Sequence, residues 1–304
     1  MNQDISKNIY LTDGGLETTL IYLEGIELTH FAAFELMNHS EGRNVLRRYF
    51  ESYISLAEKY RMGFILGTPT WRANPDWAYL LGYSLNELDK INRQSVTFLQ
   101  DIREERKAID MLVSGCIGPR SDGYVVRNLM TPDEAAEYHM TQMQSFVTAG
   151  VDLVSALTLN YVDEAIGIAL AARQLNVPLV ISFTVEVSGL LPVGEFLSRA
   201  IEKVDAATDK YVSYYMINCA HPDHFKDHLR GNGEWLRRIG GVRPNASTRS
   251  HAELDESTIL DRGDIRRLAD ECNQIMSFLP ELRVIGGCCG TDHHHMEAIC
   301  EGLL

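Results

Sequence analysis

Three cysteines in two short motifs could together hold a metal ion. Asn218-Cys219 lies in the middle of the chain, and Gly286-Gly287-Cys288-Cys289-Gly290 lies near its end. Zinc favours four tetrahedral ligands, and a site with three protein ligands keeps one position open, as catalytic sites do. The motifs therefore predict a catalytic zinc site formed by Cys219, Cys288 and Cys289, provided that the fold brings the two motifs together.

The glycines around Cys288 and Cys289 bear on whether both can reach one ion. Adjacent residues of a strand point to opposite faces, so the chain must turn at this point. Gly286, Gly287 and Gly290 give the backbone that freedom. The alternative is that Cys219 is a core residue and the adjacent pair is incidental. The remaining cysteines lie within strand or helix patterns and are interpreted as small core residues: Cys116, Cys272 and Cys300.

Asp13-Gly14-Gly15 could contact a small ligand. The glycines allow a ligand to approach the backbone closely and can present N–H groups to a carboxylate. The alternative is a tight turn capped by Asp13. Thr68 begins a second polar segment, 68–74, which either lines a substrate pocket or forms a polar loop over a packed tryptophan.

These residues must be positioned by a framework of alternating elements. Short apolar runs rich in β-branched residues are separated by longer segments with helical periodicity. The sequence predicts eight strands: Ile9–Thr12, Gly63–Gly67, Met111–Cys116, Leu153–Leu157, Leu179–Phe183, Tyr214–Ile217, Arg238–Val242 and Arg283–Ile285.

The intervening segments predict helices. Residues 44–61 repeat apolar side chains near the helical period, and residues 165–174 and 262–278 indicate further crossovers. Thr131, Pro132 and Glu134 form a helix start with a capping box, and Gly150 is a good residue to follow that helix.

Eight strands with crossovers match an α/β fold of the (β/α)8 TIM barrel type, in a single domain over residues 1–304. An open doubly wound sheet is the alternative, but the usual G-x-G-x-x-G after its first strand is absent. In a barrel, all strands end on the face that carries active sites, and two strands separated by one neighbour lie about 10 Å apart. Cys219, after the sixth strand, and Cys288-Cys289, after the eighth, can then meet. We expect residues 17–40 to form an ordered insertion over the barrel mouth.

The histidines do not form an obvious metal site. His293, His294 and His295 would point about 100° apart on a helix, so Asp292 is better interpreted as the N-cap of that helix. His221 lies near Cys219, but Pro222 and Asp223 after it indicate a helix start. A position behind the metal ligands is the other possibility for His221.

Composition and charge restrict the possible partners. The chain has 304 residues, of which 45% are hydrophobic and 23% charged, with a net charge of −14. This charge argues against nucleic acid and against an anionic membrane surface as partners. We find no apolar run long enough for a membrane helix and no signal peptide. Six cysteines are too few for a disulfide scaffold, so we expect a cytoplasmic protein. The oligomeric state stays open.

Taken in order, these motifs resemble the zinc-dependent homocysteine S-methyltransferase family. The resemblance runs along nearly the whole chain. The motifs that carry it are Asp13-Gly14-Gly15, Thr68-Pro69-Thr70-Trp71-Arg72-Ala73-Asn74, Ser114-Gly115-Cys116-Ile117-Gly118-Pro119, Asn218-Cys219 and Gly286-Gly287-Cys288-Cys289-Gly290-Thr291. It implies a (β/α)8 barrel, Zn2+ bound by the three cysteines, and homocysteine as the methyl acceptor.

The resemblance also implies where the substrate binds. Asp13, Gly14 and Gly15 would contact the amino acid part of the acceptor, and we expect Thr68 and Asn218 to bind substrate as well. No catalytic residue is expected beyond the zinc-bound thiolate of the substrate, since zinc deprotonates a bound thiol. That thiolate would attack the methyl group of a sulfonium donor, S-methylmethionine or S-adenosylmethionine, and give methionine.

Two positions depart from the family pattern. Members of the family usually carry a Glu-Thr pair at the end of the fourth strand, where the glutamate holds the ammonium group of the substrate; here Leu157 precedes Thr158. Glu186 or Asp163 could compensate, or the acceptor could be a thiol without an α-amino group. Met216 also stands where a glycine often precedes the Ile-Asn-Cys sequence.

Three functions therefore remain open. The first is methyl transfer to homocysteine. The second uses the same zinc site to methylate another small thiol or to demethylate another onium donor. The third is a non-enzymatic barrel that binds zinc or a thiol.

Overall fold

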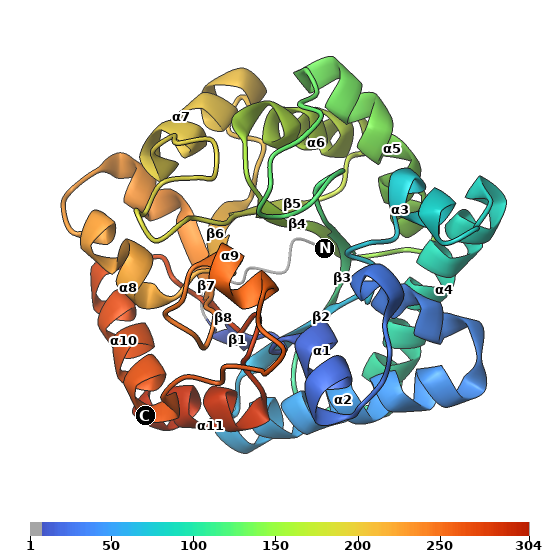
Figure 1. Ribbon diagram of the computed structural model, residues 1–304, viewed down its shortest axis with the longest axis horizontal. Coiled ribbons are helices and arrows are strands. Elements are labelled where there is room, and N and C mark those ends of the chain that lie inside the picture. Colours follow the sequence, from blue (N-terminus) through green and yellow to red (C-terminus); the bar gives the residue numbers. More distant parts are fainter. Residues whose placement is uncertain (1–7, 304) are drawn as a thin grey trace.

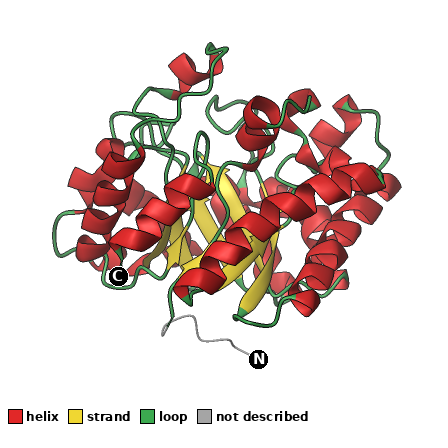
Figure 2. Ribbon diagram, turned by 90° about the horizontal axis from the view of Figure 1, so that it is seen from below, coloured by secondary structure: helices red, strands yellow, loops and turns green. Residues whose placement is uncertain are grey.

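Eight parallel strands form a closed barrel in which each strand pairs with its neighbours in chain order. The computed structural model describes residues 8–303. Figure 1 shows the ring of strands surrounded by helices, and Figure 2 shows the strands running between those helices. The strands are β1 Tyr10–Leu11, β2 Gly63–Gly67, β3 Met111–Ile117, β4 Leu153–Leu159, β5 Leu179–Phe183, β6 Tyr214–Asn218, β7 Ile239–Arg243 and β8 Val284–Ile285.

The helices follow from local signals of capping and periodicity. Thr131 caps its helix in a full capping box with Glu134, and Gly150 beyond the C-terminus has a φ of 81°. The helices are α1 Leu16–Thr18, α2 Ser40–Tyr60, α3 Pro75–Leu80, α4 Leu85–Glu105, α5 Pro132–Thr148, α6 Val162–Leu175, α7 Leu197–Thr208, α8 Pro222–Phe225, α9 His251–Asp255, α10 Ile265–Phe278 and α11 His293–Gly302.

The closed barrel confirms the predicted fold class and excludes the open doubly wound sheet. Two predicted strands differ in a way that matters. β4 continues to Leu159 through an irregularity in its pairing with β5, and Thr158 has a φ of 65° there. β7 begins at Ile239 instead of Arg238, because residues 234–238 form a short 3-10 helix. The predicted domain of residues 1–304 includes residues 1–7 and 304, which lie outside the described part of the chain.

The mouth of the barrel is covered by connections. The predicted insertion is ordered: it contains α1, a π-helical turn at Thr19–Leu23 and two 3-10 segments at Thr29–Phe31 and Ala33–Asn38. Leu16, Glu17 and Phe31 from this segment line a cavity of about 260 Å³ that opens between the strand ends. No helix within residues 8–303 is both long enough and apolar enough to span a membrane.

Candidate functional site

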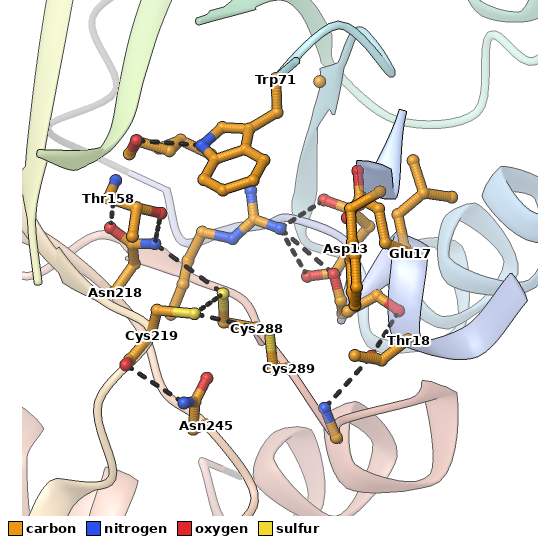
Figure 3. A pocket seen from close by; sticks show the side chains of 18 of the residues that line it. Asp13, Glu17, Thr18, Trp71, Thr158, Asn218, Cys219, Asn245, Cys288 and Cys289 are labelled. Carbon is orange, nitrogen blue, oxygen red and sulfur yellow. Dashed lines mark hydrogen bonds and ion pairs between the residues drawn. The ribbon is translucent and has the colours of Figure 1, made fainter. Parts of the chain in front are cut away.

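The three predicted metal ligands meet at the mouth of the barrel (Figure 3). The Cys219 Sγ lies 2.8 Å from the Cys288 Sγ and 3.5 Å from the Cys289 Sγ. Cys219 follows β6, and the adjacent pair follows β8 after two glycines. A Cβ at Gly286 would lie 1.8 Å from the Thr12 Oγ1, so only glycine allows this approach of β8 to β1. The predicted turn therefore brings both adjacent cysteines to one point. We call this cysteine cluster the metal end of the cavity.

Hydrogen bonds fix the backbone of Cys219. Its φ of 58° is left-handed, which is uncommon for a residue other than glycine. Its carbonyl oxygen accepts hydrogen bonds from the Asn245 Nδ2 at 3.1 Å and the His251 Nε2 at 2.6 Å. The Nδ1 of His251 lies 3.2 Å from the Glu186 Oε1. Although burial opposes the charged form, these hydrogen bonds raise the pKa of His251.

Asn218 lies beneath the sulfur atoms and links three strands. Its Oδ1 accepts hydrogen bonds from the Thr158 N–H at 2.9 Å and the Ser182 hydroxyl at 2.6 Å. Its Nδ2 donates to the Thr158 Oγ1 at 2.8 Å and lies 3.8 Å from the Cys288 Sγ. Asn218 was predicted to bind substrate. It lines the cavity, but its side chain is already committed to holding β4, β5 and β6 in place.

Tyr124 completes the metal end. No motif in the sequence predicted a role for this residue. It comes from the loop between β3 and α5, and its hydroxyl lies 2.8 Å from the Cys219 Sγ. Its ring stacks on the His251 imidazole with 4.1 Å between ring centroids. Hydrogen bonding with the Cys219 and Cys289 thiols lowers the pKa of Cys288 well below its usual range.

Asp13, Leu157 and Arg243 line the same cavity, and we call the part that they form the acceptor end. The Asp13 Oδ1 accepts a hydrogen bond from the Arg243 Nη2 at 2.8 Å, and its Oδ2 accepts one from the Tyr49 hydroxyl at 3.0 Å. The side chains of Arg243 and Asp13 are only 12% and 8% exposed. Burial raises the pKa of Asp13, and Arg243 opposes that shift. Arg243 also donates from Nε to the Gly287 carbonyl at 3.0 Å.

The other predicted substrate residues line the cavity too. A Cβ at Gly14 would lie 2.6 Å from the Tyr53 hydroxyl, and one at Gly15 would lie 2.6 Å from the Cys288 carbonyl oxygen. These glycines therefore allow close packing within the chain itself. The Thr68 Oγ1 accepts a hydrogen bond from the Cys116 N–H at 2.8 Å, so this hydroxyl already has a protein partner.

The acids named as possible substitutes for the missing glutamate do not reach the cavity wall. Glu186 contacts His251, and Asp163 is exposed in the first turn of α6. Leu157 itself is buried in an apolar cluster with Met216. Glu17 does line the cavity, and burial raises its pKa to about 7.

The histidine interpretations fit the structure. His221 caps α8 by accepting a hydrogen bond from the Asp223 N–H, and burial lowers its pKa to about 4. Its ring also lies near Asp223 and Glu271, a spacing that could hold a metal, but Lys226 and Arg267 already pair with these carboxylates. Asp292 caps α11 as predicted, and His293 to His295 form the first turn of that helix.

Comparison with known proteins gives a consistent result. A family model described as homocysteine S-methyltransferase matches residues 10–303. The metallated form of the Escherichia coli homocysteine methyltransferase MmuM is 22% identical, with a TM-score of 0.76 over 97% of this chain and 96% of that one. The apo form of MmuM is 20% identical, with a TM-score of 0.69 over the same shares. At these identities the structural likeness shows the fold. No curated protein sequence matches the chain.

Proposed function

The chain belongs to the homocysteine S-methyltransferase family and is thus an S-methyltransferase, and from this we propose that it moves a methyl group from a sulfonium donor to the sulfur of a small thiol. Homocysteine is the acceptor that the family suggests, and methionine would be the product. The observation that carries the proposal is the convergence of three cysteine sulfurs on one cavity.

The cysteine cluster fits a zinc ion. The Cys219 Sγ lies 2.8 Å from the Cys288 Sγ and 3.5 Å from the Cys289 Sγ. Tetrahedral Zn–S bonds of about 2.3 Å need sulfurs roughly 3.8 Å apart, so a bound ion would require these sulfurs to move slightly apart. Cys288 and Cys289 are partly exposed in the cavity, so a fourth ligand could approach from that side. When bound, zinc would hold the acceptor sulfur as a thiolate at neutral pH. The existence of a metallated form of MmuM supports a metal ion at this site.

The protein's own residues would position the cluster and the reactants. Asn245 and His251 hold the Cys219 backbone, and the Tyr124 hydroxyl would donate a hydrogen bond to the Cys219 sulfur once that sulfur is a thiolate. In the transfer, a lone pair of the acceptor sulfur forms the new S–CH3 bond. The old bond breaks toward the sulfonium sulfur, which leaves as a neutral thioether. Alignment and exclusion of water account for the remaining rate enhancement.

Aromatic side chains at the cavity support an onium donor. Trp71, Tyr22, Phe31 and Tyr124 line it. Faces of aromatic rings attract cations, including onium groups. This favours S-methylmethionine or S-adenosylmethionine as the donor, and both carry a sulfonium centre.

Two measurements test this function. Metal analysis of the purified protein should give about one zinc per chain, with little zinc in Cys219→Ala. A screen of sulfonium donors with homocysteine and other thiols should then reveal methyl transfer. Unchanged zinc content in Cys219→Ala would refute the metal site, and no turnover with any onium donor would refute the assigned reaction.

A second acceptor class is favoured by one observation. Leu157 occupies the place where the family usually holds the ammonium group of the substrate, and it lies in an apolar cluster. A thiol other than homocysteine, methylated at the same sulfur site, is therefore the second candidate.

A further inference from the structure

Asp13, Leu157 and Arg243, the residues that define the acceptor end, offer no free partner for an ammonium group. Leu157 packs with Met216 and Val284, and Trp71 packs against the same apolar cluster. An ammonium group placed against Leu157 would lose its water without gaining a charged partner there. Burial of an unpaired charge is strongly unfavourable.

Asp13 is already paired within the protein. One carboxylate oxygen accepts from the Arg243 Nη2, and the other accepts from the Tyr49 hydroxyl. The charge of Asp13 is therefore balanced by a guanidinium group before any substrate arrives. A substrate ammonium would compete with Arg243 and would bring a second positive charge next to it.

Arg243 has donors left for an anion. Its Nε donates to the Gly287 carbonyl, and its Nη2 donates to Asp13 and to the Gly14 carbonyl. None of the hydrogen bonds found among residues 8–303 uses Nη1. Arg243 lines the cavity that also contains Cys288 and Cys289. A planar guanidinium beside a cavity suits a carboxylate or another flat oxyanion.

We propose that the methyl acceptor is a thiol that carries an anionic group and lacks an α-ammonium group, and that Arg243 and Leu157 determine this specificity. A mercapto-carboxylate of homocysteine length is the simplest such compound. The inference rests on the proposed function, because it takes the acceptor sulfur to bind at the cysteine cluster.

Glu17 is the main rival for binding an ammonium group. Glu17 lines the cavity, and its burial raises the pKa of its carboxyl to about 7. A carboxyl that is partly protonated at neutral pH is a weaker ammonium partner than an ionised one. The experiment must nevertheless separate Glu17 from Arg243.

Three thiols of matched length form the test. Homocysteine carries both an amine and a carboxylate, γ-mercaptobutyrate carries only the carboxylate, and mercaptobutanol carries neither. Their binding to the zinc-loaded protein is measured by calorimetry, and their methylation is measured with the sulfonium donors. We expect γ-mercaptobutyrate to bind about 10-fold tighter than either of the others, the effect of one unpaired charge or one lost charged hydrogen bond. Equal or tighter binding of homocysteine would overturn the inference.

Variants at Leu157 sharpen the test. Leu157→Glu restores the acid and should shift the preference toward homocysteine by about 10-fold or more, whereas Leu157→Gln, a neutral control of the same shape, should not. Glu17→Gln should leave the wild-type preference for γ-mercaptobutyrate unchanged. A wild-type preference for homocysteine that disappears in Glu17→Gln would assign ammonium binding to Glu17 and overturn the inference.

The calorimetric binding measurements separate the proposed reaction from the proposed acceptor class. Tighter binding of γ-mercaptobutyrate without methylation of any thiol would refute the proposed reaction and leave the acceptor class intact. Methylation of homocysteine in preference to γ-mercaptobutyrate would support the reaction and refute the acceptor class. A failure of γ-mercaptobutyrate to bind at all would also refute the acceptor class.

Discussion

The metal end and the acceptor end of the cavity differ in how closely they follow the family pattern. At the metal end, Cys219, Cys288 and Cys289 are all present and their sulfur atoms meet. At the acceptor end, Leu157 stands where the resemblance to the family leads us to expect an acid, and Asp13 is already paired with Arg243. The residues for the reaction and the residues for recognition lie on different strands, so one set can change while the other stays. The reaction type is therefore better supported than the identity of the acceptor.

The largest effect should come from removing a ligand at the metal end. We expect Cys288→Ala to lose most of its zinc and at least about 10³-fold in methyl transfer, since a metal contributes several kcal/mol to such a step. Zinc content by mass spectrometry and initial rates measure this. Cys272→Ala, a change to a buried cysteine of α10, is the control and should keep its zinc. Full activity in Cys288→Ala would show that the metal end is not needed for methyl transfer.

The next effect tests whether the acceptor end is held by its internal ion pair. Arg243→Met leaves Asp13 buried without its cation, and we expect the free energy of unfolding to fall by about 3 kcal/mol. Denaturation in urea measures this.

A second change distinguishes pairing from simple packing. Asp13→Asn combined with Arg243→Met should recover a large part of the lost stability, because no unpaired charge then remains. Additive losses in the double variant would show that the two side chains do not act as a pair.

A smaller effect is expected from the hydroxyl that contacts the cysteine cluster. Tyr124→Phe removes the hydroxyl that lies 2.8 Å from the Cys219 Sγ, and we expect zinc affinity to fall by about 10-fold. Competition with a chelator measures the affinity. Tyr138→Phe is the matched control, because its hydroxyl accepts a hydrogen bond from the Asp76 N–H between α5 and α3 and does not line the cavity. An equal change of zinc affinity in both variants would show that the Tyr124 hydroxyl makes no specific contribution to metal binding.

The smallest effect concerns Glu17, whose pKa burial raises from 4.5 to about 7. A carboxyl with a higher pKa in the folded state keeps its proton there, so its contribution to stability is lost as pH rises from about 4.5 to about 7. Glutamine cannot lose a proton. Glu17→Gln should therefore raise Tm by a few °C at about pH 8 and by much less at about pH 5.

Calorimetry at both pH values checks this difference against the parent protein. A Tm difference of the same size at both would show that Glu17 has the same pKa in the folded and unfolded chains. The cavity would then contain an ordinary ionised acid at Glu17.

Much of the framework could be predicted because its signals are local. β2 and β5 have the predicted bounds, since both are short apolar runs ended by polar or turn residues. The capping boxes at Thr131 and Asp292 depend on residues three positions apart. The three cysteines of the cluster could also be predicted, because each motif follows a recognisable strand.

The missed residues depend on contacts between distant parts of the chain. Arg243 stands at the end of the seventh strand, where a charged side chain is a signal for the catalytic face, but its pairing with Asp13 exists only once the barrel closes. Tyr124 lies in a polar loop without periodicity, so nothing in its surroundings indicates that its hydroxyl reaches Cys219. His251 begins a helix of five residues and reaches the Cys219 carbonyl from there.

The three cysteines of the metal end come from distant positions in the chain, and this separation affects the stability of the C-terminal part of the barrel. Cys219 and Cys288 are 69 positions apart, and the segment between them contains β7, α9 and α10. A bound ion would therefore cross-link the ends of this segment, much as a disulfide does, and would reduce the conformational entropy of the unfolded chain. Gain of metal should thus protect this segment from proteolysis, and its removal should expose the segment first.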